Sequence, residues 1–180
     1  MRNIRLFNAM VQFKSIFYVL FFSILLTLAG CGGPECNKGV SSEKIQAVDQ
    51  TQLKADIAAI DAYLAANPNI TNVQIDPSGI RYVILKAASG GTPCLENQVS
   101  VIYDAKLLPT LQTVDSSQGT TRNFTLNQLI LGWQIMFPTF PKGTKATVYI
   151  PSGYAYGPTT AGAIPGNSNL VFTIELLGIR

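Results

Sequence analysis

The chain has 180 residues, of which 47% are hydrophobic and 13% charged, and this size suits one globular domain with accessory segments. It contains no histidine, which excludes Ser-His-Asp and Cys-His catalysis as well as histidine-ligated zinc. The net charge of +3 belongs to the basic start of the chain: from Cys31 onward ten Lys and Arg residues balance ten Asp and Glu residues, so no nucleic-acid partner is indicated.

Residues 1–30 are typical of a signal peptide. Three basic residues precede an uncharged run of 16 residues, which is shorter than the roughly 20 residues that a membrane-spanning helix needs. The tetrad Leu-Ala-Gly-Cys that ends at Cys31 resembles the lipobox of bacterial lipoproteins, which implies a lipid on Cys31 and cleavage before it. An uncleaved membrane anchor and an ordinary secreted protein are the alternatives. Gly32 does not resemble the aspartate-type retention signal of inner-membrane lipoproteins, which favours the outer membrane, facing the periplasm or the surface.

Residues 31–48 predict a tether between the lipid and the domain, because Gly, Ser, Pro and charged residues occur there without a sustained period. The two further cysteines are Cys36 and Cys94. Their spacing of 58 residues matches no metal-ligand pattern, and an oxidising space outside the membrane permits a disulfide. A disulfide and two free thiols both remain open.

Residues 49–78 predict a helix and a linker. The helix covers 49–66, because apolar residues at helical spacing line one face: Leu53, Ile57, Ile60 and Leu64. Asp49 or Thr51 can cap its start, and Asn67 before Pro68 ends it, since proline disfavours a helical residue before it. Two partners are open for the apolar face, namely the rest of the chain or a second copy.

From residue 79 onward the apolar period changes to two, which is typical of strands. The predicted extended segments are 80–86, 98–107, the short 123–126, 145–150 and 169–176. One face of the second segment carries Val99, Val101, Tyr103 and Ala105, and one face of the last carries Leu170, Phe172, Ile174 and Leu176. Residues 127–137 keep helical spacing up to Pro138. Residues 79–180 therefore predict an α+β domain in which an antiparallel sheet closes over one short helix.

Four stretches of this region together resemble the FKBP-type peptidyl-prolyl cis-trans isomerases. In chain order they are VSVIYDAKLL (99–108), VDSS (114–117), FTLNQLILGWQIMF (124–137), and the two halves KGTKATVYIPSGYAYG and IPGNSNLVFTIELL of 142–177. The resemblance covers about residues 79–180. It implies a half-barrel, an antiparallel sheet wrapped around one short helix, whose hollow holds the proline of a substrate.

The resemblance also implies roles for single residues, although each aromatic residue alone would be a core residue in almost any fold. Trp133 would be the floor of the pocket, Tyr156 would offer its hydroxyl to a substrate carbonyl, and Ile164 would offer its backbone N–H to a second one. Val114 stands where the family usually has an aromatic wall. The implied catalytic residues are Tyr103, Asp115, Trp133 and Tyr156, and the implied substrate-binding residues are Val114, Leu129, Ile130, Ile164 and Phe172.

An X–Pro bond isomerises slowly because the amide must lose its conjugation, at a barrier of about 20 kcal/mol. Isomerisation breaks no bond, so it needs no imidazole, no metal and no cofactor, and a dry aromatic pocket can favour the twisted amide. The resemblance thus implies an isomerase that assists the folding of exported proteins through their X–Pro segments, with possible binding of the family's macrolide inhibitors. The rival hypotheses are a catalytically weak FKBP-like binding or chaperone module of the cell envelope, which Val114 and Arg122 favour, and a purely structural envelope lipoprotein.

Overall fold

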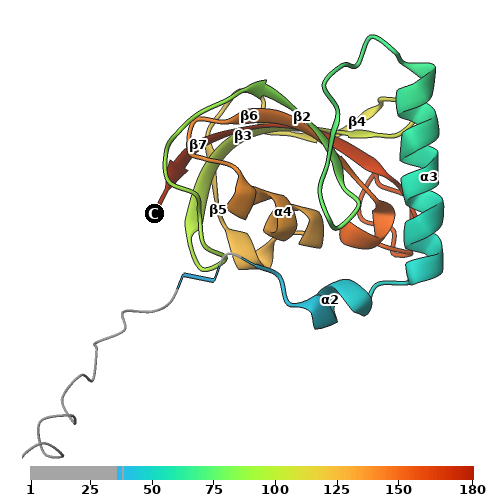
Figure 1. Cartoon of the computed structure of the whole chain (residues 1–180), viewed down its shortest axis with the longest axis horizontal. Helices are drawn as coiled ribbons and strands as arrows, with labels where there is room; N and C mark the ends of the chain where they lie inside the picture. Colours follow the sequence, from blue (N-terminus) through green and yellow to red (C-terminus); the bar gives the residue numbers. More distant parts are fainter. Residues whose placement is uncertain (1–35, 38) are drawn as a thin grey trace, which may run out of the picture. The chain divides into compact units, whose positions relative to one another are not determined.

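The computed structural model describes residues 36–180 with the exception of Lys38. The expected signal peptide and the lipid-acceptor Cys31 lie outside the described residues. A seven-stranded antiparallel sheet dominates the described part, and Figure 1 shows it arching over helix α4 (Leu131–Met136). Its strands are β1 (Gln74–Ile75), β2 (Arg81–Lys86), β3 (Gln98–Leu107), β4 (Thr113–Ser116), β5 (Arg122–Thr125), β6 (Lys145–Ile150) and β7 (Leu170–Ile179).

Strand β3 lies at the centre of the arrangement that builds the site. The sheet runs β1-β2-β6-β7-β3-β4, and β5 also pairs with β3. The first half of β3 pairs with β5, from Gln98 to Val101, and the second half pairs with β4, from Asp104 to Lys106. Two short strands therefore share one edge of β3, and Tyr103 lies where one gives way to the other. The predicted α+β architecture, an antiparallel sheet wrapped around one short helix, is confirmed.

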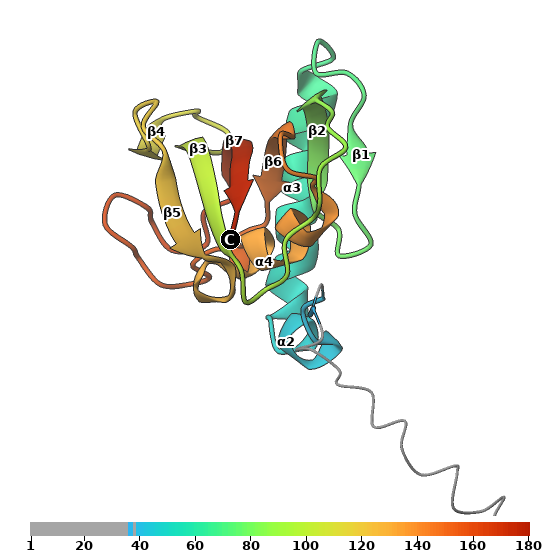
Figure 2. The ribbon, with the colours of Figure 1, turned by 90° about the vertical axis from the view of Figure 1, so that its left-hand side faces the viewer.

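The two faces of the sheet bury different partners, because successive side chains of a strand point to opposite sides. On the inner face of β7, Leu170, Phe172, Ile174 and Leu176 are buried in the main core together with residues of α4. Val171 faces the other side, where it forms a second cluster with Tyr149 and with Ile60 of helix α3 (Gln50–Ala66). Figure 2 shows α3 and α4 on different sides of the strands.

Helix α3 begins and ends where the sequence predicts. Asp49 is its N-cap and accepts hydrogen bonds from the amides of Thr51 and Gln52 at 2.8 and 3.1 Å, and Asn67 before Pro68 is its C-cap. The apolar face packs on the chain's own core and sheet through Leu53 and Ile60. A two-fold hydrogen-bonded ion pair between Arg81 of β2 and Asp61 adds a polar clamp, with nitrogen–oxygen distances of 2.8 and 2.7 Å.

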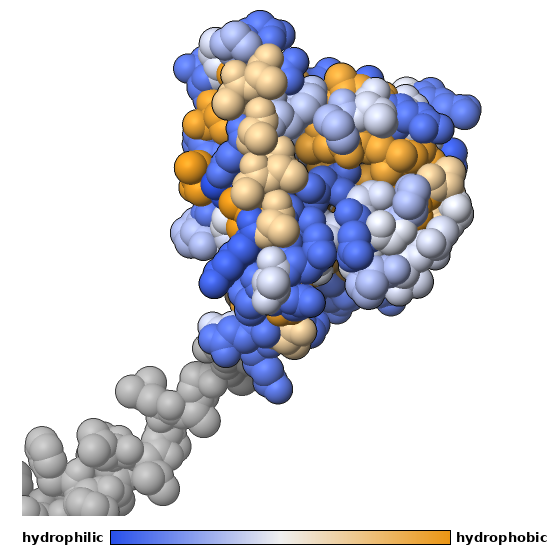
Figure 3. Space-filling view, turned by 90° about the vertical axis from the view of Figure 1, so that its right-hand side faces the viewer, coloured by the Kyte–Doolittle hydropathy of each residue, from blue (hydrophilic) through white to orange (hydrophobic). Residues whose placement is uncertain are grey.

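Figure 3 views the face of the described part that α3 covers. Mildly hydrophobic side chains form a strip along the helix between hydrophilic ones, in keeping with the exposed alanines of α3. Across residues 36–180, Lys38 aside, none of the helices has both the length and the apolar character of a membrane-crossing segment.

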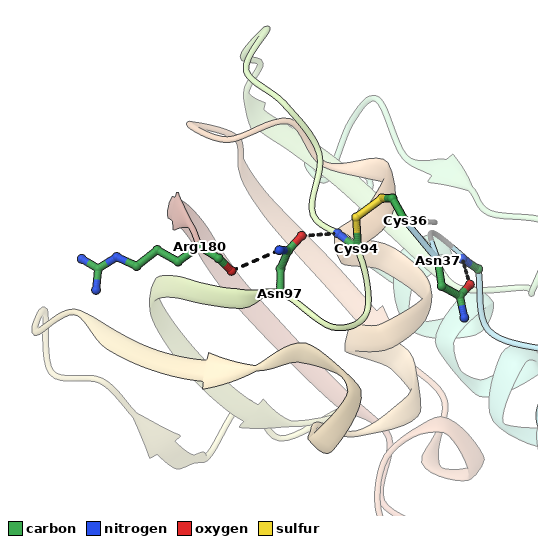
Figure 4. The surroundings of a disulfide bond; sticks show 6 residues. Cys36, Asn37, Cys94, Asn97 and Arg180 are labelled. Carbon is green, nitrogen blue, oxygen red and sulfur yellow. Dashed lines mark hydrogen bonds between the residues drawn. A yellow bond between two sulfur atoms is a disulfide. The ribbon is translucent and has the colours of Figure 1, made fainter. Parts of the chain in front are cut away.

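The segment before α3 differs from the expectation of a structureless tether. Residues Ser42–Gln46 form helix α2, and Val40, Ile45 and Val48 pack against the core. A disulfide joins Cys36 to Cys94, which decides between the two open alternatives (Figure 4). The amide of Leu95 donates to the carbonyl oxygen of Asn37 at 2.8 Å. Composition did not reveal this docking because the three apolar contacts are too widely spaced to show a period.

The helix predicted over 127–137 is divided into three pieces. A 3-10 turn (Leu126–Gln128) comes first, the backbone is extended at Leu129 and Ile130, and α4 follows before a second 3-10 turn that contains Pro138. The side-chain amide of Gln134 donates to the carbonyls of Asn127 and Leu129 at 3.2 and 2.6 Å, which satisfies two acceptors left by the break. The strands β1 and β4 also lack a counterpart among the segments predicted from the apolar period.

Candidate functional site: an aromatic cavity

Trp133 owes its position to a close approach between α4 and β6. A Cβ atom placed on Gly132 would lie 2.6 Å from Cγ2 of Ile150, so a larger residue would push the helix away from the strand. Trp133 follows directly, and its side chain is only 4% exposed. One face of the indole stacks on Phe137, with ring centroids 4.8 Å apart and an interplanar angle of 25°. This support fixes the plane of the indole.

Three other rings stand almost upright on the indole. Tyr103 and Phe172 have centroids 5.5 Å from it at interplanar angles of 86° and 81°, and Phe124 lies at 6.3 Å and 86°. Edge-to-face contacts of this kind are a favoured geometry for aromatic pairs. The three rings come from β3, β5 and β7, so the pairing of β3 with both neighbours assembles them.

These rings border a cavity of about 260 Å³, which is lined by Tyr103, Asp115, Phe124, Gln128, Leu129, Ile130, Trp133, Tyr156 and Phe172. The volume lies just below the range of about 300–1,000 Å³ that is typical of sites for drug-sized ligands. It therefore suits a single compact side chain. The indole is deeply buried but still forms part of the cavity wall, so the floor is accessible from the opening.

Asp115 ties the rim of the cavity together. Its Oδ2 atom accepts a hydrogen bond of 2.7 Å from the hydroxyl of Tyr103, and its Oδ1 atom accepts one of 2.8 Å from the amide of Ser116. Burial, this hydrogen bond and the negative charge of Asp115 together raise the pKa of Tyr103 to about 12. Tyr103 is therefore a neutral phenol at physiological pH, and its ring is held in one orientation.

Tyr156 lies in the loop between β6 and β7 and is the most exposed of the cavity's aromatic side chains, at 42%. Burial, and secondly the charge of Asp115, raise the pKa of its phenol. Its hydroxyl makes no hydrogen bond to any residue in the described part of the chain. The group is thus a neutral donor at the mouth of the cavity and is free to meet an incoming carbonyl.

The structure brings together seven of the nine residues that the sequence assigned to the site. All four expected catalytic residues and Leu129, Ile130 and Phe172 line the cavity. Val114 and Ile164 are not among the lining residues: Val114 is half-buried on β4, and Ile164 is 6% exposed in the core.

The expected donor at Ile164 is already engaged. Its backbone N–H donates to the carbonyl oxygen of Ala161 at 3.0 Å, and the amide of Ala161 donates back to Ile164 at 2.9 Å. The amide of Ile130 lies at the break before α4, in a residue that lines the cavity, and meets no acceptor within residues 36–180 that the structure describes. Of the two residues, Ile130 is the one that lines the cavity and whose amide no acceptor of the described residues engages.

Sequence reasoning missed two lining residues, Phe124 and Gln128. Phe124 pairs with Val99 across β3 and β5, and cross-strand neighbours point to the same face, so the inward Val99 carries Phe124 inward. Phe124 stands at the start of a stretch that carries the resemblance, but this pairing is what shows that it lies on the inner face. Gln128 belongs to the 3-10 turn, which the sequence suggested as helix. In the part of the chain that the structure describes, no three Cys, Asp or Glu side chains are grouped so as to hold a metal.

Comparisons with known proteins agree with this geometry. Residues 90–177 match the family model of the FKBP-type peptidyl-prolyl cis-trans isomerases. The chain is 38% identical over 138 residues to the FKBP-type isomerase FkpA of Aeromonas hydrophila, which covers 72% of this chain and 51% of that protein. It is 33% identical to the 22 kDa FKBP-type isomerase of Escherichia coli, with 76% of this chain and 68% of that protein covered.

A solved structure of a peptidyl-prolyl cis-trans isomerase from Pseudomonas syringae pv. tomato superposes with a TM-score of 0.61 at 30% identity, covering 73% of this chain and 95% of the other. The chain spans about half the length of several curated relatives that it matches, such as the outer membrane protein MIP of Legionella longbeachae, of which 52% is covered. Identity, coverage and the shared fold lead to one conclusion: the chain belongs to the family of FKBP-type peptidyl-prolyl cis-trans isomerases.

Proposed function

We propose that this protein is a peptidyl-prolyl cis-trans isomerase that acts on X–Pro segments of exported proteins at the bacterial cell envelope. The observation that carries the proposal is the set of three rings standing on Trp133 around a cavity of about 260 Å³. A prolyl ring is a compact apolar group, and burying it against aromatic side chains is favourable. A cavity of this size accommodates a prolyl ring and leaves little room for much larger side chains.

The reaction requires a site that binds the twisted amide better than the planar one. Twisting removes the conjugation between nitrogen and carbonyl, so the carbonyl carries less negative charge at the transition state than in the ground state. A water-poor cavity lined by Trp133, Phe124 and Phe172 penalises the more polar planar amide more strongly. Differential binding of this kind accelerates the rotation without a nucleophile or a proton transfer.

Two donors can hold the peptide while the bond turns. The hydroxyl of Tyr156 and the amide of Ile130 both lie at the cavity and are free to meet carbonyl oxygens on either side of the proline. Fixing the flanking carbonyls keeps the ring seated and makes rotation an intramolecular event. Asp115 contributes indirectly, because its hydrogen bond keeps the ring of Tyr103 in the wall.

The place of action is part of the same proposal. The tetrad ending at Cys31 supports a lipid anchor, and relatives of this chain include a protein named as an outer membrane protein. The disulfide between Cys36 and Cys94 supports export, because such bonds form and persist in oxidising compartments. We infer a lipid-anchored isomerase of the bacterial envelope, on the outer membrane, facing the periplasm or the surface.

The test measures cis-trans exchange of a short X–Pro peptide with the purified protein, with and without a macrolide inhibitor of the family. Trp133→Leu and Tyr156→Phe should each lower kcat/KM on the order of tenfold or more, because they remove the floor and a donor. Tyr63→Phe makes the same chemical change as Tyr156→Phe on α3, at a residue that packs against Tyr149, and should leave the rate unchanged. Peptide binding without turnover would instead identify a catalytically weak binding module, and unchanged rates in both site variants would refute the site.

A further inference from the structure

The loop that carries Tyr156 is anchored at its start. β6 ends at Ile150, and a 3-10 turn (Ser152–Tyr154) follows. The amides of Ala155 and Gly157, on either side of Tyr156, both donate to the carbonyl oxygen of Ser152, at 2.9 and 2.8 Å. Because two bonds converge on one carbonyl, the position of Ser152 determines where the backbone of Tyr156 lies.

Ser152 is held in turn by an acidic side chain of α3. The hydroxyl of Ser152 donates to Oδ2 of Asp56 at 2.5 Å, and the amide of Gly153 approaches the same oxygen at 3.4 Å. The other oxygen, Oδ1, accepts from the side-chain amide of Gln52 one helical turn earlier, at 2.8 Å. The carboxylate of Asp56 thus joins the outer helix to the turn that leads to the cavity.

This contact is costly to build, which indicates that it is specific. Asp56 is 3% exposed and Ser152 1% exposed. No Lys or Arg of the described residues forms an ion pair with Asp56. A buried carboxylate is tolerated only where hydrogen bonds replace its hydration, and an apolar residue would pack α3 at a lower desolvation cost. Packing alone therefore does not account for an aspartate here.

Two further contacts strengthen the same junction. The side-chain oxygen of Asn169 accepts from the amide of Ser152 at 2.9 Å, and its nitrogen lies 3.4 Å from the carbonyl oxygen of Asp56. Val48, just before α3, packs so closely on Gly153 that a Cβ there would lie 2.5 Å from Cγ1 of Val48. The turn is consequently gripped by residues from three parts of the chain.

We propose that Asp56 is a positioning residue for the prolyl site, acting through Ser152 to hold Tyr156 at the mouth of the cavity. Asp56 lies in α3, outside the residues 90–177 that match the family model. In this proposal, α3 therefore contributes to the geometry of the site although it lies outside the matched region. The role in turnover rests on the proposed isomerase function. The effect on the placement of Tyr156 does not depend on it.

Asp56→Asn and Ser152→Ala test the link, and Asp61→Asn is the matched control. Asp61 is on the same helix and also binds a partner in the sheet, but its partner is Arg81, which does not belong to the turn. Ser152→Ala removes a single hydroxyl and so remains informative if the exchange at Asp56 prevents folding. Three quantities are measured on each purified variant: the free energy of unfolding in urea, kcat/KM for a short X–Pro peptide, and the pKa of the Tyr156 phenol followed by NMR of its ring.

Asp56→Asn and Ser152→Ala should lower kcat/KM on the order of tenfold, since a displacement of about 1 Å at a reacting group has effects of this size or larger. The pKa of Tyr156 should fall toward its ordinary value, because the released ring gains water. The Asp61→Asn variant should have a lower free energy of unfolding, but its kcat/KM and its pKa of Tyr156 should be unchanged. An equal response of Asp61→Asn, or an unchanged Tyr156 in the first two variants, would overturn the proposal. Absent turnover in the unmodified protein would refute the isomerase function alone, and the phenol titration would still decide the role of Asp56.

Discussion

Asp115 influences the charge state of two phenols at the cavity. Its carboxylate accepts a hydrogen bond from the hydroxyl of Tyr103, and its charge also raises the pKa of Tyr156. Desolvation is the larger cause for both rings, so their neutral state follows mainly from the cavity itself. Burial already keeps the phenols neutral, and Asp115 in addition fixes the orientation of the Tyr103 ring through its hydrogen bond.

A pH-dependent stability follows from the raised pKa of Tyr103. The phenol releases its proton near pH 10 in the unfolded chain but only near about 12 in the folded one. The stabilising contribution is complete below pH 10 and is lost as the pH rises from 10 toward 12, because the folded state there binds more protons than the unfolded state. Asp115→Asn should make this loss smaller, which urea unfolding on both sides of pH 10 would measure.

The control for this experiment is Tyr154. Burial and the charge of Asp76, a different carboxylate, raise its pKa. Asp115→Asn should therefore leave the titration of Tyr154 unchanged, whereas Asp76→Asn should move Tyr154 and leave Tyr103 as it is. A uniform shift of all phenols would show that the exchange alters the fold and not the local field.

At the scale of elements, the site depends on how closely α4 approaches β6. Gly132 permits the contact with Ile150, and the break at Leu129 and Ile130 turns the chain so that α4 starts under the sheet. Trp133 then projects into the space between β3, β5 and β7. Because Trp133 lines the cavity, the distance between α4 and the strands determines how deep the cavity is.

Gly132→Ala tests this dependence. The added methyl group would lie 2.6 Å from Cγ2 of Ile150, so we expect overpacking that costs about 1–3 kcal/mol of unfolding free energy and shifts Trp133. Urea unfolding and the fluorescence of the sole tryptophan measure the two effects. Gly91→Ala is the control, because no heavy atom of the described residues lies within 4 Å of a Cβ at that position, and its effect should stay within about 0.5 kcal/mol. Equal stability of the two variants would contradict the close contact.

At the scale of the whole molecule, the disulfide attaches part of the predicted tether, residues 31–48, to the domain. Cys36 is bonded to Cys94, and Val40, Ile45 and Val48 pack against the core, so the described chain is attached to the domain from Cys36 onward. Five residue steps separate Cys36 from Cys31, and an extended chain spans at most about 3.6 Å per residue, or roughly 18 Å. If Cys31 carries the lipid, this short connection keeps the domain close to the membrane surface.

The anchor itself is testable by labelling. Expressed in a bacterium with a labelled fatty acid, the protein should become labelled and sediment with membranes, because several acyl chains anchor firmly. Cys31→Ser should abolish both, whereas Cys94→Ser, which removes a disulfide partner, should abolish neither. Label retained in the Cys31→Ser variant would contradict acylation at this residue.

The sequence alone was sufficient for the elements whose signal is local. The period of two predicted β3 and β6 with their correct bounds, and helical spacing with Asp49 and Pro68 delimited α3. The ordered motifs around Trp133 and Tyr156 indicated the family and seven of the lining residues. Such features can be predicted from the sequence because a few neighbouring residues determine them.

Only the tertiary structure decided which distant residues meet. The pairing of β3 with β5 put Phe124 into the cavity, and the bridge between Ala161 and Ile164 engages the amide of Ile164, which the sequence had suggested as a donor. The disulfide of Cys36 and the junction between Asp56 and Ser152, 96 residues apart, likewise leave no local trace. Contacts of this kind depend on how whole elements pack, and packing is a property of the folded chain and not of any short segment.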